Sequence, residues 1–315
     1  MKIFNYEETH ALLSFPPLIE GLKEAFQGGI QAPKRHHHTM ETEKTEEPST
    51  LLLMPAWKKN EGVGIKIVTV TPGNMARGLP SVGGHYIFLD GITKVPLALF
   101  DGGALTLMRT SATSALASRY LSRVNSKTFL MVGTGALAPH LIKAHASQRP
   151  LENIMIWGRN YKKAQILASS LEVEGANIKA IKNLESACAQ TDIISTATLS
   201  SKPLIFGDWV KEGTHIDLVG AYRPDMRESD NALIQKSSVF VDTFLGALSE
   251  AGDIIQPLET GLINHESIKG EIKDLVSGGH KGRDTDKEIT LFKSVGASLE
   301  DYTAASLAWD NSNLI

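Results

Sequence analysis

The residues of this chain best suited to chemistry form a run of small side chains that follows an apolar stretch. After Phe129–Val132 comes Gly133-Thr134-Gly135-Ala136-Leu137-Ala138, which has the G-x-G-x-x-G/A spacing. In such a run the first glycine permits a tight turn, the second lets a pyrophosphate approach the backbone, and the last small residue lets a helix pack on a strand. The helix start then offers free N–H groups to the phosphates. The run lies between a strand pattern and a helix pattern and therefore predicts a dinucleotide site; a plain glycine-rich turn is the alternative.

The end of the next predicted strand indicates which dinucleotide is bound. An NAD site usually carries an acidic residue there, which binds the ribose hydroxyls. This chain has Arg159-Asn160 after Ile154–Trp157 instead, and a guanidinium can pair with a 2′-phosphate. We therefore predict NADPH, with NADH as the second choice, and an Arg159 that is merely exposed to solvent is the alternative. The residues expected to contact the cofactor are Gly133, Thr134, Gly135, Ala136, Leu137, Ala138, Arg159, Asn160, Thr196, Thr198, Val219, Gly220 and Ala221.

Two cations suggest a site for an anionic substrate. Lys66 lies within the strand pattern Gly64–Val70 and shares a face with Val68 and Val70, where a charge is costly unless an anion pairs with it. Arg109 is expected to open a helix over residues 108–122, where a cation opposes the helix dipole. Arg109 together with free N–H groups would make a good carboxylate site. An ordinary ion pair is the alternative for each residue.

Metal and thiol chemistry are not indicated. Adjacent residues on a strand alternate faces, so His36, His37 and His38 cannot all reach one ion, and no further Cys or His has ligand spacing. The single cysteine, Cys188, falls in a predicted helix over 183–190 and is expected to be a buried thiol. One cysteine allows no intrachain disulfide, so the fold does not depend on an oxidising compartment.

The elements that must position these residues are of two kinds. Up to about residue 105 the chain is rich in short strand patterns, after one amphipathic helix at Ile19–Phe26 and a polar stretch at Lys34–Thr50 that is interpreted as a strand or two and a loop. Asp90-Gly91 is typical of a hairpin turn. The expected strands are Thr50–Met54, Gly64–Val70, His85–Leu89 and Val95–Phe100.

Beyond about residue 108, apolar strands alternate with helices, which indicates a parallel sheet with crossover helices. The strands are expected at 129–132, 154–157, 178–181, 192–197, 215–219 and 238–243, and the helices at 108–122, 136–147, 161–171 and 183–190. A last helix, within 296–307, could pack back on the first part. We therefore expect an α/β protein, with residues 109–299 as the dinucleotide-binding domain and 1–108 with 300–315 as the second domain.

Composition excludes several classes of function. The chain has 315 residues, 42% of them hydrophobic, and a formal net charge of −3, so no global field favours nucleic acid or an anionic membrane. Its basic residues are scattered, unlike the stripe of a nucleic-acid binder. No apolar run approaches the roughly 20 residues of a membrane span, and the acidic N-terminal residues are not typical of a signal peptide. We expect a cytoplasmic protein without nucleic-acid or membrane partners.

Several of these motifs together resemble the ornithine cyclodeaminase/μ-crystallin family. The resemblance runs from about Arg35 to about Thr303, through Lys66, Arg109-Thr110, the glycine run at 133–135, the segment Gly220–Glu228 and Phe292–Gly296. It implies a Rossmann-type doubly wound parallel sheet, a β-rich domain for substrate binding and dimerisation, and a homodimer. It also implies hydride transfer at an amino acid's α-carbon, with the carboxylate held by Arg35, Lys66 and Arg109, next to Thr110.

The segment after Gly220 separates branches of that family. Cyclodeaminases carry an aspartate there that works with the substrate amine, whereas this chain has Tyr222 and no acid before Asp225. The segment Ala221–Glu228 looks like that of μ-crystallin and bacterial ketimine reductases. We therefore predict an NADPH-dependent reductase of Δ1-pyrroline-2-carboxylate, with the six-membered homologue as a second substrate, in which Lys66 and Arg109 act on the substrate. The alternatives are an ornithine cyclodeaminase, an alanine-type or opine-type dehydrogenase, and a non-catalytic NADPH-binding protein.

Overall fold

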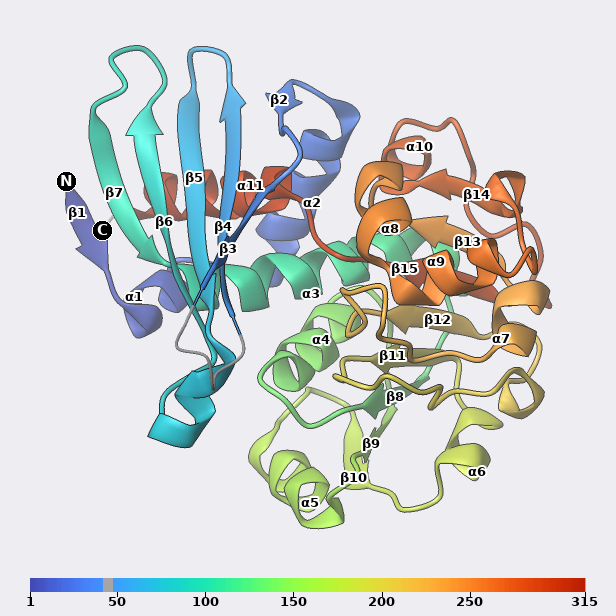
Figure 1. Cartoon of the computed structure of the whole chain (residues 1–315). Coiled ribbons are helices and arrows are strands. Elements are labelled where there is room, and N and C mark those ends of the chain that lie inside the picture. Colours follow the sequence, from blue (N-terminus) through green and yellow to red (C-terminus); the bar gives the residue numbers. More distant parts are fainter. Residues whose placement is uncertain (42–47, 315) are drawn as a thin grey trace. The chain divides into compact units, whose positions relative to one another are not determined.

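A computed structural model describes residues 1–41 and 48–314 of the chain (Figure 1). The described chain forms two compact units: Met1–Thr110 together with Ala297–Ile315, called unit 1 here, and Ser111–Gly296, called unit 2. Residues 42–47, which belong to the polar stretch expected to contain strand and loop, lie outside the described residues. Both units combine helices with a sheet, as expected for an α/β protein.

Unit 1 is built on a mixed sheet. Its strand order is β1-β7-β6-β5-β4-β2, with β3 also paired to β4, and only the β1–β7 pair among its described strands is parallel. The expected hairpin strands are confirmed: the first three are longer than the pattern indicated, and the last has the expected length but is shifted by one residue. The strands are β1 (Lys2–Phe4), β2 (Ile30–Gln31), β3 (His36–Met40), β4 (Ser49–Lys58), β5 (Gly62–Val70), β6 (Val82–Asp90) and β7 (Pro96–Asp101).

Helices cover one face of the unit 1 sheet. The C-terminal helix α11 (Ser298–Ser312) packs on β4, β5, β6 and α2 (Phe15–Gln27), and Figure 1 shows it running behind these strands. The first helix, α1 (Tyr6–Ala11), contacts β1 and β7, and a 3₁₀ turn follows β5 at Pro72–Arg77. The covered face carries buried side chains such as Met54, Tyr86 and Phe88, and it also carries Lys66. The predicted return of the chain's last helix to the first part of the sequence is confirmed.

The helix that holds Arg109 begins earlier than the sequence indicated. α3 spans Gly102–Leu121, so Arg109 lies in its second turn and not at its start. The start of α3 is capped by the Asp101 carboxylate, which accepts a hydrogen bond from the Ala104 N–H at 2.8 Å. The prediction that Arg109 sits beside free helix N–H groups is therefore wrong. Two glycines at the helix start concealed it, because glycine is a poor helix former.

Unit 2 contains a parallel sheet with the order β10-β9-β8-β11-β12-β15-β13-β14. The chain runs outward from β8 to β9 and β10, then returns to the other side of β8 for β11 and β12, which is the doubly wound arrangement predicted. The strands are β8 (Thr128–Val132), β9 (Asn153–Trp157), β10 (Asn177–Ala180), β11 (Ile193–Thr196), β12 (His215–Leu218), β13 (Ser238–Val241), β14 (Ile268–Glu271) and β15 (Thr290–Lys293). The sequence pattern did not reveal β14 or β15, which lie on either side of β13.

Both faces of the unit 2 sheet are buried. Alternate residues of β8 enter different cores: Phe129 and Met131 pack in one cluster with α4 and α5, and Leu130 and Val132 pack in the other. This explains the continuous apolar strands, since period-two exposure is lost when both faces are covered. The helices of unit 2 are α4 (Leu137–Ala146), α5 (Tyr161–Ser170), α6 (Leu184–Cys188), α7 (Asn231–Lys236), α8 (Phe244–Glu250), α9 (Gly252–Glu259) and α10 (Ile272–Val276), with 3₁₀ turns at Gly207–Trp209 and His265–Ser267.

Two arginines cap the C-terminal end of α3. The last carbonyls of a helix lack partners within it. Arg149 Nη2 donates to the carbonyls of Ser118 and Arg119 at 3.0 and 2.7 Å. Arg283 donates to Tyr120 O from its backbone N–H at 3.1 Å and to Leu121 O from Nε at 2.8 Å. This gathering of arginines therefore has a structural explanation, because cations at a helix C-terminus also complement its dipole.

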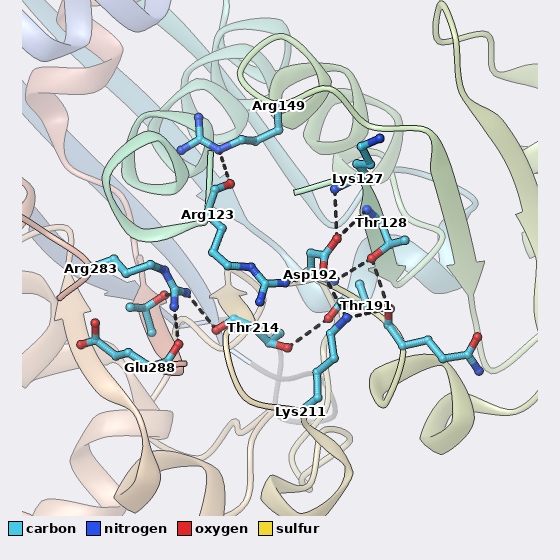
Figure 2. Close-up of polar contacts among 12 residues, drawn as sticks. Arg123, Lys127, Thr128, Arg149, Thr191, Asp192, Lys211, Thr214, Arg283 and Glu288 are labelled. Atoms are coloured by element: carbon cyan, nitrogen blue, oxygen red, sulfur yellow. Dashed lines mark hydrogen bonds and ion pairs between the residues drawn. The ribbon is translucent and has the colours of Figure 1, made fainter. Parts of the chain in front are cut away.

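Asp192 organises the neighbouring amino ends of the strands (Figure 2). Its carboxylate accepts from Arg123 Nη2 at 2.6 Å, from Lys211 Nζ at 3.0 Å and from the backbone N–H groups of Lys127 and Thr128 at 3.0 Å each. Although burial opposes ionisation, these hydrogen bonds lower the pKa of Asp192 to about 2. The cluster therefore joins β8 and β11 at the edge of the sheet opposite to the glycine run.

Candidate functional site

In unit 1, Lys66 and Arg109 are buried and share carboxylates of α11. Lys66 is 3% exposed and Arg109 is 6% exposed. Lys66 Nζ lies 2.9 Å from Asp301 Oδ1, and Arg109 Nε lies 3.2 Å from the same oxygen. Arg109 Nη1 also pairs with Glu300 Oε2 at 2.8 Å, and Lys66 donates to the Thr106 hydroxyl. The strand β5, the middle of α3 and the start of α11 thus meet in one cluster of two cations and two anions.

Burial and charge shift the pKa values of this cluster. Burial lowers the pKa of Lys66, while the negative charge of Asp301 opposes that shift. Burial would raise the pKa of Asp301, but Lys66 and then Arg109 hold it below its ordinary value. Arg35 contributes in the same sense to both shifts, so its charge acts on the cluster too. The four charges sum to zero, and Arg35 is the further cation.

Two buried polar atoms of the cluster have unused hydrogen-bonding capacity. Among the described residues, neither Asp301 Oδ2 nor Tyr86 Oη has a hydrogen-bond partner. Tyr86 is fully buried, and burial followed by the charge of Asp301 raises the pKa of its hydroxyl well above the usual value. A buried acceptor and a buried donor that are unsatisfied in the protein are suited to a polar ligand.

Sequence reasoning found only the cations of this cluster. Sequence reasoning missed the other members: Asp301, Glu300, Thr106 and Tyr86. Nothing in the sequence indicates that a strand at 62–70 and a helix at 298–312 are neighbours in the fold. Their one signal was the costly Lys66 on an apolar strand face, which required an anion somewhere. Thr110, also predicted, is 8% exposed and follows Arg109 in α3.

The histidines before β4 divide between the two faces of the sheet. Arg35 directly precedes β3 and is half-buried. In the β3–β4 register His37 lies opposite Leu52, and Leu52 lies opposite Val68, which places His37 on the Lys66 face. His36 and His38 lie opposite Leu53 and Leu51 and therefore belong to the other face. Among the described residues no group of three or more His, Cys, Asp or Glu is placed to hold a metal ion.

In unit 2, the glycine run follows β8 with the geometry that a dinucleotide requires. Gly133 has a φ of 126°, and a Cβ there would lie 2.6 Å from Ala197 O, so only glycine fits. Gly135 is exposed, and a Cβ on it would meet open space among the described atoms, which leaves its backbone accessible. No described side chain caps the start of α4, and Ala138 is fully buried against the sheet. The residues present therefore fit a bound pyrophosphate.

Arg159 and Asn160 follow β9 at the same edge of the sheet. Both are exposed, and Asn160 caps α5 by accepting a hydrogen bond from the Lys163 N–H at 3.3 Å. A Cβ at Gly158 would lie 2.7 Å from Thr134 Cγ2, so this turn packs directly on the glycine run. Arg159 therefore follows directly on a turn that packs against the glycine run.

The other predicted cofactor residues lie at the ends of β11 and β12 or just beyond them. Thr196 and Val219 are joined by a backbone hydrogen bond of 2.9 Å from Val219 N to Thr196 O. Gly220 and Ala221 are buried, and Thr198 is half-buried. Because parallel strands end at one edge, these residues share that edge with the glycine run.

Two further expectations concern residues outside these sites. Cys188 is buried in α6, and burial raises the pKa of its thiol to about 12, so it is not a nucleophile at neutral pH. No helix in the described part of the chain is long and apolar enough to cross a membrane.

Comparison with known proteins agrees with this geometry. The sequence profile of the ornithine cyclodeaminase/mu-crystallin family matches residues 5–313. A Δ1-pyrroline-2-carboxylate reductase of Colwellia psychrerythraea is 37% identical over 308 residues, which cover 97% of each chain. A solved structure of Thermococcus litoralis Δ1-pyrroline-2-carboxylate reductase with NADH and L-proline superposes with a TM-score of 0.92 at 35% identity, covering 100% of this chain and 98% of that one. An archaeal alanine dehydrogenase dimer with bound NAD gives 0.90 at 30% identity, covering 100% and 97%.

Proposed function

Since the chain belongs to the ornithine cyclodeaminase/mu-crystallin family, we propose that it is a nicotinamide-dependent reductase of cyclic ketimine amino acids. Its substrate is Δ1-pyrroline-2-carboxylate, reduced to L-proline, with Δ1-piperideine-2-carboxylate and L-pipecolate as the six-membered pair. Unit 1 binds substrate and unit 2 binds the dinucleotide. The observation that carries the proposal is the buried cluster of Lys66, Arg109, Glu300 and Asp301, because its mixed charges suit a zwitterionic ring.

The charges of the cluster assign roles to its members. The substrate carries a carboxylate and, when its imine nitrogen is protonated, a positive charge beside it. Arg35, Lys66 and Arg109 hold the carboxylate, with Thr110 beside them, and the unused oxygen of Asp301 accepts a hydrogen bond from the iminium N–H. The cationic groups of Lys66, Arg109 and Arg35 act together on this site and favour a ligand that carries a carboxylate.

The chemistry then needs no protein nucleophile. The bound nicotinamide supplies the hydride. When the imine binds already protonated, hydride addition at the C=N carbon yields the neutral amine directly, and the Asp301 carboxylate stabilises the cation before that step. When it binds unprotonated, Lys66 donates the proton, since burial lowers its pKa and makes the ammonium group a stronger acid.

For the cofactor, NADPH is preferred over NADH. Arg159 lies at the end of β9 without an acidic residue beside it to hold a ribose 2′-hydroxyl. Solved relatives at 35% and 30% identity hold NADH and NAD, so NADH is the second substrate of the same site.

The uncovered face of the unit 1 sheet supports a homodimer. Its strands present half-buried apolar side chains in register on the face opposite Lys66: Leu53, Pro55, Trp57, Val63, Ile65, Ile67, Ile87, Leu89 and Leu99. A contiguous apolar surface of this kind favours association. A solved relative at 30% identity is a dimer. Ile65→Asp is expected to give a monomer by light scattering, whereas Ile166→Asp, at an exposed position of α5, leaves the dimer intact.

Activity assays distinguish the proposal from its rivals. Purified protein is expected to oxidise NADPH with Δ1-pyrroline-2-carboxylate, followed at 340 nm, and to be silent with L-ornithine and NAD⁺. Tyr222, at the position expected of the cyclodeaminase aspartate, is 42% exposed and carries no carboxylate. Turnover of pyruvate with ammonia would indicate an alanine-type dehydrogenase, and cofactor binding without any turnover would indicate a binding protein. Lys66→Met should abolish turnover, while Lys127→Ala, at a surface ion pair, should not.

A further inference from the structure

Glu228 is a fully buried carboxylate that the proposed chemistry does not use. Its Oε1 accepts hydrogen bonds from the Thr198 backbone N–H at 2.8 Å and from the Thr198 hydroxyl at 2.7 Å. Its Oε2 accepts from the Gly220 N–H at 2.7 Å. One side chain therefore joins the residues that follow two neighbouring strands, β11 and β12.

The two segments joined by Glu228 are in close contact. A Cβ on Gly220 would overlap the backbone N and O of Thr198 and would lie 2.6 Å from Glu228 Oε1. Glycine is thus required at 220 by close packing, and the carboxylate fixes the spacing. A small displacement of Glu228 would therefore move both segments.

Glu228 is itself held firmly. The Asp253 carboxylate accepts from the N–H groups of Glu228 and Ser229 at 3.0 and 2.9 Å, and Glu228 O accepts from Leu204 N at 2.8 Å. Lys293 is buried nearby and donates to Leu218 O, the last residue of β12, at 3.2 Å. Burial raises the pKa of Glu228, and Lys293 opposes that rise. The backbone of Glu228 is therefore held by hydrogen bonds, and this restricts the position of its carboxylate.

The topology of the sheet indicates which part of the cofactor would lie beside the two segments that Glu228 joins. A dinucleotide lies across the point where a doubly wound sheet reverses, with one half on each side. The side of β9 carries Arg159, suited to the adenosine end, so the nicotinamide end of a bound dinucleotide would extend over β11 and β12. We propose that Glu228 is a positioning residue that holds Thr198 and Gly220 in place for the nicotinamide half of the cofactor. The inference rests on the proposed function and adds to it a residue that touches neither substrate nor cofactor.

The test compares the binding of two ligands, one that contains the nicotinamide half of the cofactor and one that lacks it. Glu228→Gln replaces an acceptor pair by one acceptor and one NH₂ group, so either Thr198 or Gly220 faces a donor. We expect this variant to bind NADPH about tenfold more weakly, as one charge-assisted hydrogen bond implies. It should bind 2′-phospho-ADP-ribose, which lacks nicotinamide, within about twofold of the wild-type value. Calorimetric titration of the full-length protein gives both dissociation constants.

Asp217 provides the matched control. It is an equally buried carboxylate, in β12. Its Oδ2 accepts from Ser195 Oγ of the neighbouring strand β11 at 2.6 Å and bonds Nε2 of His145, in α4, at 3.2 Å. Asp217→Asn should lower the melting temperature yet bind both ligands as the wild type does. If Glu228→Gln does not fold, Glu228→Asp serves instead, since the shorter side chain keeps the charge but cannot hold both Thr198 and Gly220 at the same spacing, and it should give the same split.

The outcomes are distinguishable. Selective loss of NADPH affinity supports the inference. Equal loss for both ligands, or no loss for either, would overturn it and leave Glu228 a purely structural residue. Wild-type protein that binds neither ligand would refute the proposed function and the inference with it, and would be recognised before any variant was made.

Discussion

Asp301→Asn should destabilise unit 1 strongly, because two buried cations depend on one oxygen of Asp301. Lys66 Nζ and Arg109 Nε lie 2.9 and 3.2 Å from Oδ1, and the Asp301 side chain is fully buried. Removing one partner of a buried ion pair leaves an uncompensated charge and costs about 3–5 kcal/mol. Arg109 keeps Glu300 as a partner, so most of that loss arises at Lys66.

A double-variant cycle measures this coupling. Lys66→Met replaces the cation by an apolar side chain of similar length, so Asp301→Asn combined with Lys66→Met should be more stable than Asp301→Asn alone. A coupling of roughly 1–3 kcal/mol is expected for groups in direct contact. Hydrogen exchange of peptides covering β5 and α11 reports on unit 1 directly, and protection of both should fall in Asp301→Asn and recover in the double variant.

The pH dependence has a definite sign. The folded pKa of Asp301 is held below its ordinary value, so its stabilising contribution is complete at neutral pH and is lost as pH falls through that lowered value. The stabilities of the wild type and Asp301→Asn should therefore begin to converge below about pH 4, the ordinary pKa of an aspartate, and the convergence should be complete only below the lowered pKa of folded Asp301. Equal exchange protection in the wild type and Asp301→Asn at pH 7, or a double variant no more stable than the single one, would refute the reasoning.

Three other predictions follow from the site. Arg159→Ala should weaken NADPH binding roughly 10- to 100-fold, the range for a lost hydrogen bond to a charged group, and leave NADH binding unchanged; equal loss for both cofactors would show that Arg159 does not contact the 2′-phosphate. Gly133→Ala should abolish binding of either cofactor, since its φ is 126° and a Cβ would meet Ala197 O at 2.6 Å; wild-type affinity by titration would contradict this. Cys188, whose thiol pKa burial raises to about 12, should react with an aromatic disulfide reagent only after unfolding, and rapid labelling of the native protein would contradict its burial.

The order of elements in unit 2 could be predicted largely from local pattern, whereas β14 and β15 could not. A fully buried parallel strand such as β8 is a continuous apolar run, and this local pattern alone predicts a strand. β15 reads Thr-Leu-Phe-Lys, and its lysine, buried against Leu218 O, hides the pattern. The start of α3 was misplaced for a similar reason, since Gly102 and Gly103 are weak helix formers and the cap at Asp101 was the only signal.

In the candidate site, too, local sequence pattern located the residues that are contiguous but not the contacts between distant parts of the chain. The glycine run and its flanking strand and helix are contiguous, so spacing alone located them. Lys66 and Asp301 are 235 positions apart, and no periodicity connects them. The sequence indicated that Lys66 needed an anion, but which acid met it depends on how α11 packs over β5, and that is decided by tertiary structure.

The closure of unit 1 by α11 has a consequence for synthesis on the ribosome. When residues 1–110 have emerged, Lys66 and Arg109 exist without Glu300 and Asp301, which are translated only after the whole of unit 2. Until α11 is made, the sheet of unit 1 must therefore leave these cations in water, because the face that α11 will cover is still open. By the time α11 is translated, all the strands of unit 2 have been translated already. Domains usually complete in the order in which they are made. Here the first sheet to emerge is the last to be finished, and a released chain that ends at Ala297 should show protease resistance in unit 2 alone.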